Sequence, residues 1–194
     1  PIVGGSILSH DHFQGGNYEF PMAKAEVEHK FNVSKFPNIK AGIVNWPMSV
    51  IRISSKNREE LLDFANEILE KWRAYSDETV GIHAFSNETP HNTITPIARR
   101  RNDEFELDLV LRNNRTSDNH PLGIFHPHEE YHNIKKENIG LIEVMGLAVL
   151  PGRLKEEINI LTEYLSKENS LESIKKKKKV SKHYSWITSI KENI

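Results

Sequence analysis

The sequence predicts an α+β domain in which two helices pack against a mostly antiparallel sheet. The observations behind this are several short segments rich in Val, Ile, Phe and Thr, and two longer segments whose apolar residues recur at helical spacing. The chain has 194 residues, of which 37% are hydrophobic and 27% are charged. This length and composition are ordinary for a domain with a sizeable core, so we expect one domain over 1–194.

The first predicted strand covers 25–33, where apolar and polar residues alternate strictly. Alternate side chains of a strand share a face, so one face holds Ala25, Val27, His29, Phe31 and Val33. We therefore expect His29 to point inward. A hydrogen-bonded histidine at the edge of a core is the commoner case at such a position, and a ligand is the alternative.

Four further strands are predicted from β-branched and aromatic residues, at 49–54, 80–85, 92–98 and 105–111. In the last of these, acidic residues alternate with Phe105, Leu107 and Leu109. We expect the acidic side of this strand to face solvent, because carboxylates are rarely buried.

Two segments are predicted to be helices. The first covers about 57–75, with Ser54 or Ser55 as its cap, and its apolar stripe is Leu61, Ala65, Ile68 and Trp72. The second covers 154–165, where the same spacing recurs in Leu154, Ile158, Leu161 and Leu165. The apolar run 141–150 is bounded by Gly140 and Pro151, and we interpret it as a buried strand.

Charge and cysteine content exclude several classes of protein. The formal net charge of −1 gives no global reason to expect nucleic acid as a partner. No run approaches the roughly 20 apolar residues of a membrane span, so the default expectation is a cytoplasmic location. The chain has no cysteine, which excludes disulfides and thiolate metal sites.

A basic C-terminal tail segment is predicted at 166–194, and it contains five consecutive lysines at 175–179. We expect the lysines to form a solvated helix end or a mobile surface stretch, with an anionic partner as the alternative. Tyr184, Trp186 and Ile187 follow the lysines and indicate that the chain returns to pack there.

The most informative chemistry lies in His10, Asp11, His12, Phe13 and Gln14, which are flanked by two Gly-Gly pairs. If this segment is an extended strand, His10, His12 and Gln14 share one face. A neutral imidazole is a good nucleophile, an amide two residues away can contact a phosphoryl oxygen, and glycines let backbone N–H groups approach an anion. The pattern favours phosphorus chemistry, with metal ligands or polar surface histidines as the alternatives.

The run Ser9-His10-Asp11-His12-Phe13-Gln14-Gly15-Gly16 resembles the active-site strand of the bacterial-type galactose-1-phosphate uridylyltransferases, which belong to the histidine-triad superfamily. Two later blocks, 91–99 and 131–146, resemble the same branch, so the similarity extends from about Gly4 to Pro151. The resemblance implies a histidine-triad-like half-barrel sheet packed by helices, with an active-site strand within 1–16. The other branch of the family has proline where this chain has Asp11.

The resemblance also implies roles for individual residues. The covalent nucleophile falls on His12, the preceding histidine on His10, and the phosphoryl-contacting amide on Gln14. The implied reaction moves UMP between UDP-glucose and galactose 1-phosphate through a uridylyl-histidine. Backbone amides and hydroxyls near the motif are candidate further donors to phosphate, and they belong to Gly5, Ser6 and Ser9.

Further substrate contacts are expected among charged residues later in the chain. Arginine offers forked donors to phosphoryl oxygens, and the candidates are Arg99, Arg100, Arg101, Arg112 and Arg115, of which we select Arg99 and Arg101. Glu143 lies in an apolar run, so we expect it to contact a ribose or sugar hydroxyl. A polar substrate-facing loop or a metal site is expected from the histidine-rich stretch of His120, His126, His128 and His132.

The resemblance places this chain as the C-terminal half of a longer enzyme, with a processed complete protein as the alternative. We therefore expect a missing N-terminal half as a partner, no turnover by the chain alone, and self-association through a bare strand edge. No cofactor is certain, although zinc or iron in the full enzyme would rest on histidine and carboxylate ligands. Two other functions stay open: a histidine-triad nucleotide hydrolase or phosphorylase, and a non-catalytic nucleotide-binding module.

Overall fold

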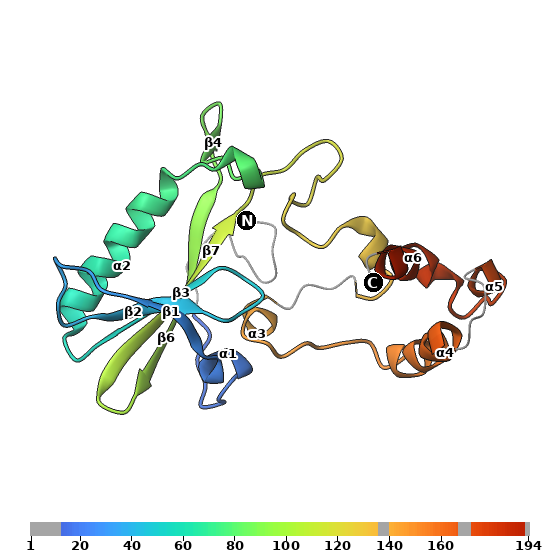
Figure 1. Ribbon diagram of the computed structural model, residues 1–194, viewed down its shortest axis with the longest axis horizontal. Helices are drawn as coiled ribbons and strands as arrows, with labels where there is room; N and C mark the ends of the chain where they lie inside the picture. Colours follow the sequence, from blue (N-terminus) through green and yellow to red (C-terminus); the bar gives the residue numbers. More distant parts are fainter. Residues whose placement is uncertain (1–12, 136–139, 167–171, 193–194) are drawn as a thin grey trace. The chain divides into compact units, whose positions relative to one another are not determined.

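The computed structural model describes residues 13–135, 140–166 and 172–192. The chain divides into two compact units (Figure 1), whereas the sequence led us to expect one domain. One unit is Asn17–Phe125, and the other contains the residues from His126 onward together with those before Asn17. No helix among the described residues is long and apolar enough to cross a membrane.

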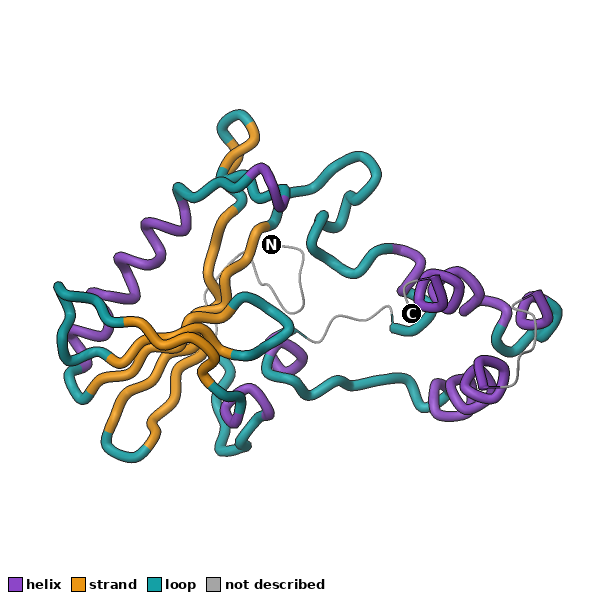
Figure 2. Tube along the Cα trace, viewed as in Figure 1, coloured by secondary structure: helices purple, strands orange, loops and turns teal. Residues whose placement is uncertain are grey.

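The first unit is built around a five-stranded antiparallel sheet (Figure 2) with the order β1-β2-β3-β7-β6. Its strands are β1 (Val27–Phe31), β2 (Lys40–Val44), β3 (Val50–Ser55), β6 (Asn92–Arg101) and β7 (Glu104–Asn113). A separate hairpin is formed by β4 (Phe85–Ser86) and β5 (Thr89–Pro90). The predicted strands at 49–54, 92–98 and 105–111 are confirmed, and β2 was missed.

The helix α2 (Arg58–Arg73) covers one face of this sheet (Figure 1) and confirms the first predicted helix. Leu61 and Phe64 are buried against Ile53 and Leu109 of the sheet. The cap is Asn57, whose side chain accepts hydrogen bonds from the backbone N–H groups of two residues in the first turn. The predicted caps Ser54 and Ser55 belong instead to β3.

The segment 80–85 is not the strand that we predicted. A short 3-10 helix, η1 (Glu78–Val80), occupies its start, and Asp77 caps that turn by accepting from Thr79. Gly81 follows with a φ of 71°, which a strand cannot accommodate. Only the end of the predicted segment enters the β4 strand.

The strand predicted at 25–33 is confirmed as β1, but the expectation that His29 points into a core is wrong. Its side chain is 70% exposed. In the register of the sheet, His29 lies opposite Ile43 and therefore on the face that α2 covers elsewhere. However, β1 is the edge strand, and α2 packs mainly on β3, β6 and β7. The alternation places His29 on the correct face, but the helix does not extend over it. A bulge between Val27 and His29 puts Val27 on the other face, because its partner is Val44.

The second unit is helical. It contains α3 (Leu141–Val144), α4 (Leu154–Ser166), α5 (Glu172–Lys175) and α6 (Tyr184–Glu192), with 3-10 turns η2 (Glu129–Tyr131) and η3 (Ser181–His183). The helix predicted at 154–165 is confirmed as α4. The buried strand predicted at 141–150 is wrong: α3 begins the segment, and the positive φ of Gly146, 94°, interrupts any extended run.

The apolar residues of the basic segment 166–194 pack with α4 to form the small core of this unit. Leu161 of α4 packs with Ile174, Val180 and Ile187, all of which are buried. The lysines at 175–179 are exposed, as predicted, and lie between the buried residues Ile174 and Val180. Tyr184 and Trp186 pack against the same core, which confirms that the chain returns after the lysines.

A buried ionic cluster joins α4 to η3 and α6 in this unit. Glu157 of α4 accepts hydrogen bonds from Arg153 at 2.6 Å, Lys182 at 2.7 Å and His183 Nε2 at 2.8 Å. His183 Nδ1 accepts from the indole N–H of Trp186 at 3.0 Å. Because an indole nitrogen only donates, the proton of His183 lies on Nε2 and points at Glu157. Burial raises the pKa of Glu157, but the three donors outweigh it and lower the pKa from 4.5 to about 2.

The substitution Glu157→Gln is expected to destabilise the helical unit at neutral pH by roughly 3 kcal/mol, because the folded carboxyl has the lower pKa. This contribution is present above about pH 4.5 and is lost as the pH falls toward 2. The measurement is urea unfolding from neutral pH to pH 2, followed by the indole NMR signal of Trp186.

The matched control is Glu156→Gln, since Glu156 precedes Glu157 in the same helix but is 66% exposed in its pair with Lys179. We expect a change below about 1 kcal/mol for that variant. Equal losses in the two variants would show that the buried cluster does not stabilise this unit.

Candidate active site

The predicted catalytic motif is only partly within the described residues. His10 and His12, with Gly5, Ser6 and Ser9, lie outside them. Gln14 is described and exposed, in a segment from Phe13 to Gly16 that belongs to no helix or strand. No described strand includes or pairs with these four residues, and the active-site strand within 1–16 stays a prediction. Phe13 is 95% exposed, and the role of Gln14 stays a prediction.

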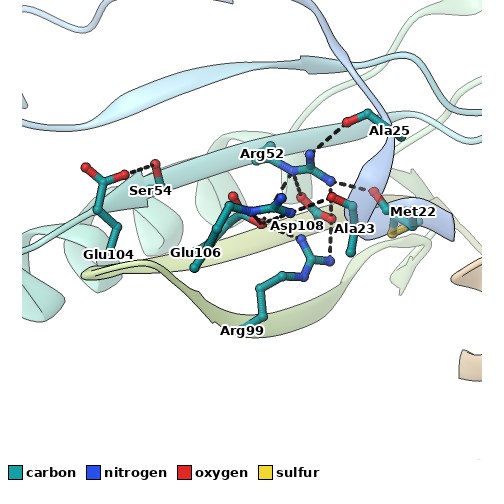
Figure 3. Close-up of polar contacts among 10 residues, drawn as sticks. Met22, Ala23, Ala25, Arg52, Ser54, Arg99, Glu104, Glu106 and Asp108 are labelled. Carbon is teal, nitrogen blue, oxygen red and sulfur yellow. Dashed lines mark hydrogen bonds and ion pairs between the residues drawn. The ribbon is translucent and has the colours of Figure 1, made fainter. Parts of the chain in front are cut away.

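The strongest electrostatic feature of the first unit is a set of buried charges on the sheet face opposite α2 (Figure 3). In β7, Leu107 and Leu109 face α2, so Glu106 and Asp108 face the other way. We predicted that this acidic side faces solvent, and that prediction is wrong. Glu106 is 6% exposed and Asp108 is fully buried.

Arginine side chains from neighbouring strands surround these two carboxylates (Figure 3). Asp108 accepts from Arg52 Nε at 2.7 Å and Nη2 at 2.9 Å, and from Arg99 Nη2 at 2.7 Å. Glu106 accepts from Arg99 Nη1 at 2.6 Å and from Arg101 Nη2 at 3.1 Å. The register brings them together, because Arg52 pairs with Asp108, and Arg99 pairs with Glu106.

Two of these arginines also bind the short helix α1 (Pro21–Lys24), which lies on this face (Figure 3). Arg52 donates to the carbonyl oxygens of Met22 at 2.7 Å and Ala25 at 2.9 Å, and Arg101 donates to that of Ala23. Three guanidinium groups face two carboxylates, and the carbonyl oxygens of Met22, Ala23 and Ala25 accept three further hydrogen bonds from them. The backbone at 22–25, which follows the predicted catalytic motif in the chain, is thus attached to the sheet by the side chains of Arg52 and Arg101.

Arg99 and Arg101, the two arginines that we selected as phosphate ligands, both belong to this cluster. Burial lowers the pKa of Arg99, but its hydrogen bonds to Asp108 and Glu106 outweigh that effect, and the net pKa is raised. Both terminal nitrogens of Arg99 are held by carboxylates, and Arg101 is held by Glu106 and Ala23. Phosphate contact by Arg99 and Arg101 stays a prediction. To bind phosphate, each would have to give up or share its hydrogen bonds to the carboxylates.

The other three arginine candidates have different surroundings. Arg100 lies over the ring of Phe105, with its guanidinium carbon 5.1 Å from the ring centroid. Arg112 is half-buried, and burial lowers its pKa. Arg115 donates to the carbonyl oxygen of Gly81 at 2.6 Å, and its buried Nε has no hydrogen-bond partner. Among the described residues, Arg112 and Arg115 form no ion pair and are the better candidates for an anion.

Two further predictions concern the second unit. Glu143 forms an ion pair with Lys135, which accounts for its charge in an apolar run; sugar contact by Glu143 stays a prediction. The histidine-rich stretch spans both units, with His120 in the first and His126, His128 and His132 in the second. Within the described part of the chain, no three or more His, Asp or Glu side chains are placed to hold a metal ion. A metal site at this stretch stays a prediction.

Sequence reasoning missed Arg52, which makes four hydrogen bonds in the buried cluster. The signal was present: a single arginine lies inside the apolar β-forming run of β3, where a charge is costly unless it is paired. The alternating acidic residues of β7 include Asp108, the carboxylate that pairs with Arg52.

Comparison with known proteins decides the family. The model of the galactose-1-phosphate uridyl transferase C-terminal domain matches residues 2–186. The chain belongs to this family. A galactose-1-phosphate uridylyltransferase from Fusobacterium nucleatum is 66% identical over 96% of the chain. Proteins of the same name from Halalkalibacterium halodurans and Bacillus subtilis are 62% and 53% identical, over 99% and 100% of the chain.

The chain spans only part of these family members. It corresponds to 37% of the Fusobacterium protein, 38% of the Halalkalibacterium protein and 39% of the Bacillus protein. No solved structure matches the chain. The resemblance that the sequence motifs suggested is therefore confirmed at the level of the family and of its C-terminal domain.

The substitution Asp108→Asn is expected to destabilise the first unit by about 3–5 kcal/mol, because it leaves the buried guanidinium groups of Arg52 and Arg99 without their shared carboxylate. The measurement is amide hydrogen exchange in β3 and β7 of the 194-residue chain at increasing urea concentrations.

Glu104→Gln is the control on the same face of β7. Glu104 pairs with Lys40, whose side chain is 74% exposed, so we expect a loss of at most about 1 kcal/mol. A loss for Asp108→Asn no larger than for this control would contradict a structural role for the buried cluster.

Proposed function

We propose that this chain acts in uridylyl transfer, exchanging UMP between UDP-glucose and galactose 1-phosphate through a covalent intermediate on His12. The observation that carries the proposal is the identity of 53–66% to proteins named galactose-1-phosphate uridylyltransferase, over nearly the whole chain. The motif of His10, His12 and Gln14 adds a chemical basis, because it combines a nucleophile with a donor for phosphoryl oxygen.

In the proposed reaction, the neutral imidazole of His12 attacks the α-phosphorus of UDP-glucose. A nitrogen–phosphorus bond forms, the phosphorus–oxygen bond to the β-phosphate breaks, and glucose 1-phosphate leaves. A phosphate oxygen of galactose 1-phosphate then attacks the same phosphorus and displaces the imidazole, which yields UDP-galactose. His12 attacks through one nitrogen, so its other nitrogen must carry the proton and donate a hydrogen bond to a fixed acceptor, for which a backbone carbonyl is our candidate.

Gln14 is proposed to stabilise the charge that grows on the non-bridging oxygens during both steps. Its exposed position in a segment without regular structure leaves the amide accessible to a ligand. Backbone N–H groups at Gly5 and hydroxyls of Ser6 and Ser9 are proposed as further donors, and His10 as structural support or a phosphate contact.

The wider arrangement is also part of the proposal. We propose that the antiparallel sheet is a histidine-triad-like half-barrel, and that the chain works together with an N-terminal half of similar fold. The chain spans only 37–39% of the length of these family members, which supports such a partner. A cytoplasmic location, pairing of copies and a zinc or iron ion elsewhere in the enzyme stay predictions from the sequence.

The first experiment uses a full-length chimera, in which this chain replaces the matching part of the Fusobacterium nucleatum protein. Incubation with UDP-glucose is expected to add one uridylyl group, detected by intact mass and mapped to His12. The His12→Ala chimera is expected to give no adduct, because the attacking nitrogen is absent.

His29→Ala is the matched control, because His29 is an exposed histidine on the edge strand. This variant is expected to form the adduct at the normal rate. An adduct in the His12→Ala chimera, or an adduct mapped to another residue, would overturn the assignment of the nucleophile. Release of free UMP at the rate of adduct loss would favour the hydrolase alternative.

Gln14→Ala is expected to slow adduct formation by about 10²–10³-fold while UDP-glucose binding changes little, because the amide acts mainly in the transition state. Rapid-quench measurement of the adduct at saturating UDP-glucose separates the two effects. If binding weakens and the rate of the chemical step is unchanged, Gln14 is a binding residue and its proposed role is wrong.

A further inference from the structure

Arg112 lies near the end of β7, on the sheet face opposite α2. Leu107 and Leu109 of this strand pack toward α2, so Asp108 and Arg112, at even positions, face the other way. The guanidinium group of Arg112 is half-buried, yet it makes no hydrogen bond or ion pair with any part of the chain that the structure describes. A charge that is partly removed from water without a partner is costly, so this residue requires an explanation.

The other arginines on this face have carboxylate partners (Figure 3). Arg52 and Arg99 both bind Asp108, and Arg101 binds Glu106. Burial lowers the pKa of Arg99, but its hydrogen bonds to carboxylates outweigh that effect and raise the net pKa. Burial also lowers the pKa of Arg112, and there no carboxylate of the described chain opposes it. Arg112 therefore lacks the acceptor that each of its neighbours has.

Two threonine hydroxyls accompany Arg112 on the same face. Thr93 is its partner in the register of β6 and β7, and Thr95 follows on that face of β6, opposite Val110. Thr93 is exposed and Thr95 is half-buried. Within the described residues, neither hydroxyl has a hydrogen-bond partner. A guanidinium fork with hydroxyl groups beside it is a set of donors suited to phosphate oxygens.

The backbone that carries these donors is fixed from the opposite side of the sheet. The indole N–H of Trp72 in α2 donates to the carbonyl oxygen of Thr93 at 3.0 Å and to that of Arg112 at 3.1 Å. Val110 and its partner Val50 in β3 are fully or almost fully buried. The donors thus stand on a rigid part of the sheet and are positioned before a ligand binds.

We propose that Arg112, with the hydroxyls of Thr93 and Thr95, binds a phosphate group of the nucleotide substrate. The guanidinium offers two parallel N–H groups to two oxygens of one phosphate, and no carboxylate of the described chain competes for them. Arg99 and Arg101, which we selected from the sequence, would instead have to give up or share hydrogen bonds to carboxylates.

The phosphate site rests on Arg112 and its surroundings, whereas the identity of the ligand as a nucleotide rests on the proposed function. Binding of pyrophosphate requires no covalent step at His12, so failure of the uridylyl adduct experiment would leave the phosphate site intact. Conversely, a normal adduct in a chain without Arg112 would leave the nucleophile in place and remove Arg112 from the reaction.

The first test is an NMR titration of the 194-residue chain with inorganic pyrophosphate, UDP and neutral uridine. Pyrophosphate and UDP are expected to shift the Nε–H signal of Arg112 and the amide signal of Thr93, because both ligands carry phosphate groups. Uridine is expected to shift neither signal.

The second test compares Arg112→Met with the matched control Arg100→Met. Arg100 belongs to the same hairpin but lies over the ring of Phe105, on the face that α2 covers. Arg112→Met is expected to weaken UDP binding about tenfold, the effect of losing charge-assisted hydrogen bonds, whereas the control is expected to change it less than twofold. In the full-length chimera, Arg112→Met is expected to raise the KM for UDP-glucose by a similar factor.

Stability separates a binding role of Arg112 from a structural one. Methionine keeps most of the aliphatic stem and removes an unpaired charge, so Arg112→Met is expected to leave the urea midpoint of the first unit unchanged or to raise it. A lower midpoint would show that the charge supports the fold and would contradict the proposal. It is overturned equally if pyrophosphate leaves the Arg112 signal in place, or if the two substitutions weaken UDP binding to the same extent.

Discussion

The buried ion pair between Arg52 and Asp108 is the constraint on which the first unit depends. Two charged groups in an interior cost several kcal/mol unless each finds partners with good geometry. Arg52 meets this condition with four hydrogen bonds, two to Asp108 and two to the backbone at Met22 and Ala25. The pair therefore holds β3 and β7 in register and attaches α1 to the sheet at the same time.

The helical unit follows the same principle with different residues. Glu157 is nearly buried and has three donors from two segments of the chain, and His183 is oriented by Trp186 on its other side. In both units, a buried carboxylate with several cationic partners connects elements that are distant in the sequence.

Helices and central strands were predictable because their periodicity is strong. The stripe of α2 and the alternation of β7 both appear in the sequence and both lead to the correct element. What covers each face was not predictable, and two errors have this cause: Asp108 is buried under α1, and His29 is exposed because α2 does not extend over β1. The strand β2 was missed because of Gly42, which weakens a strand pattern. The sheet requires a glycine there, since an added Cβ would lie 2.7 Å from the backbone oxygen of His29 and would also clash with Val27 Cγ1.

The functional motif was recognisable from the sequence, but most of it lies outside the described residues. His10, His12 and Gln14 were recognisable from residue types and spacing alone, and the comparisons confirm the family that they suggested. Of these three, the structure describes only Gln14.

A two-step route through a covalent histidine differs from direct transfer between the two substrates in one respect. In the two-step route, each half of the reaction proceeds without the substrate of the other half. The most direct measurement is therefore isotope exchange in the full-length chimera, with labelled glucose 1-phosphate and UDP-glucose but without galactose 1-phosphate. The account predicts that label enters UDP-glucose under these conditions; exchange that appears only when galactose 1-phosphate is added would contradict it.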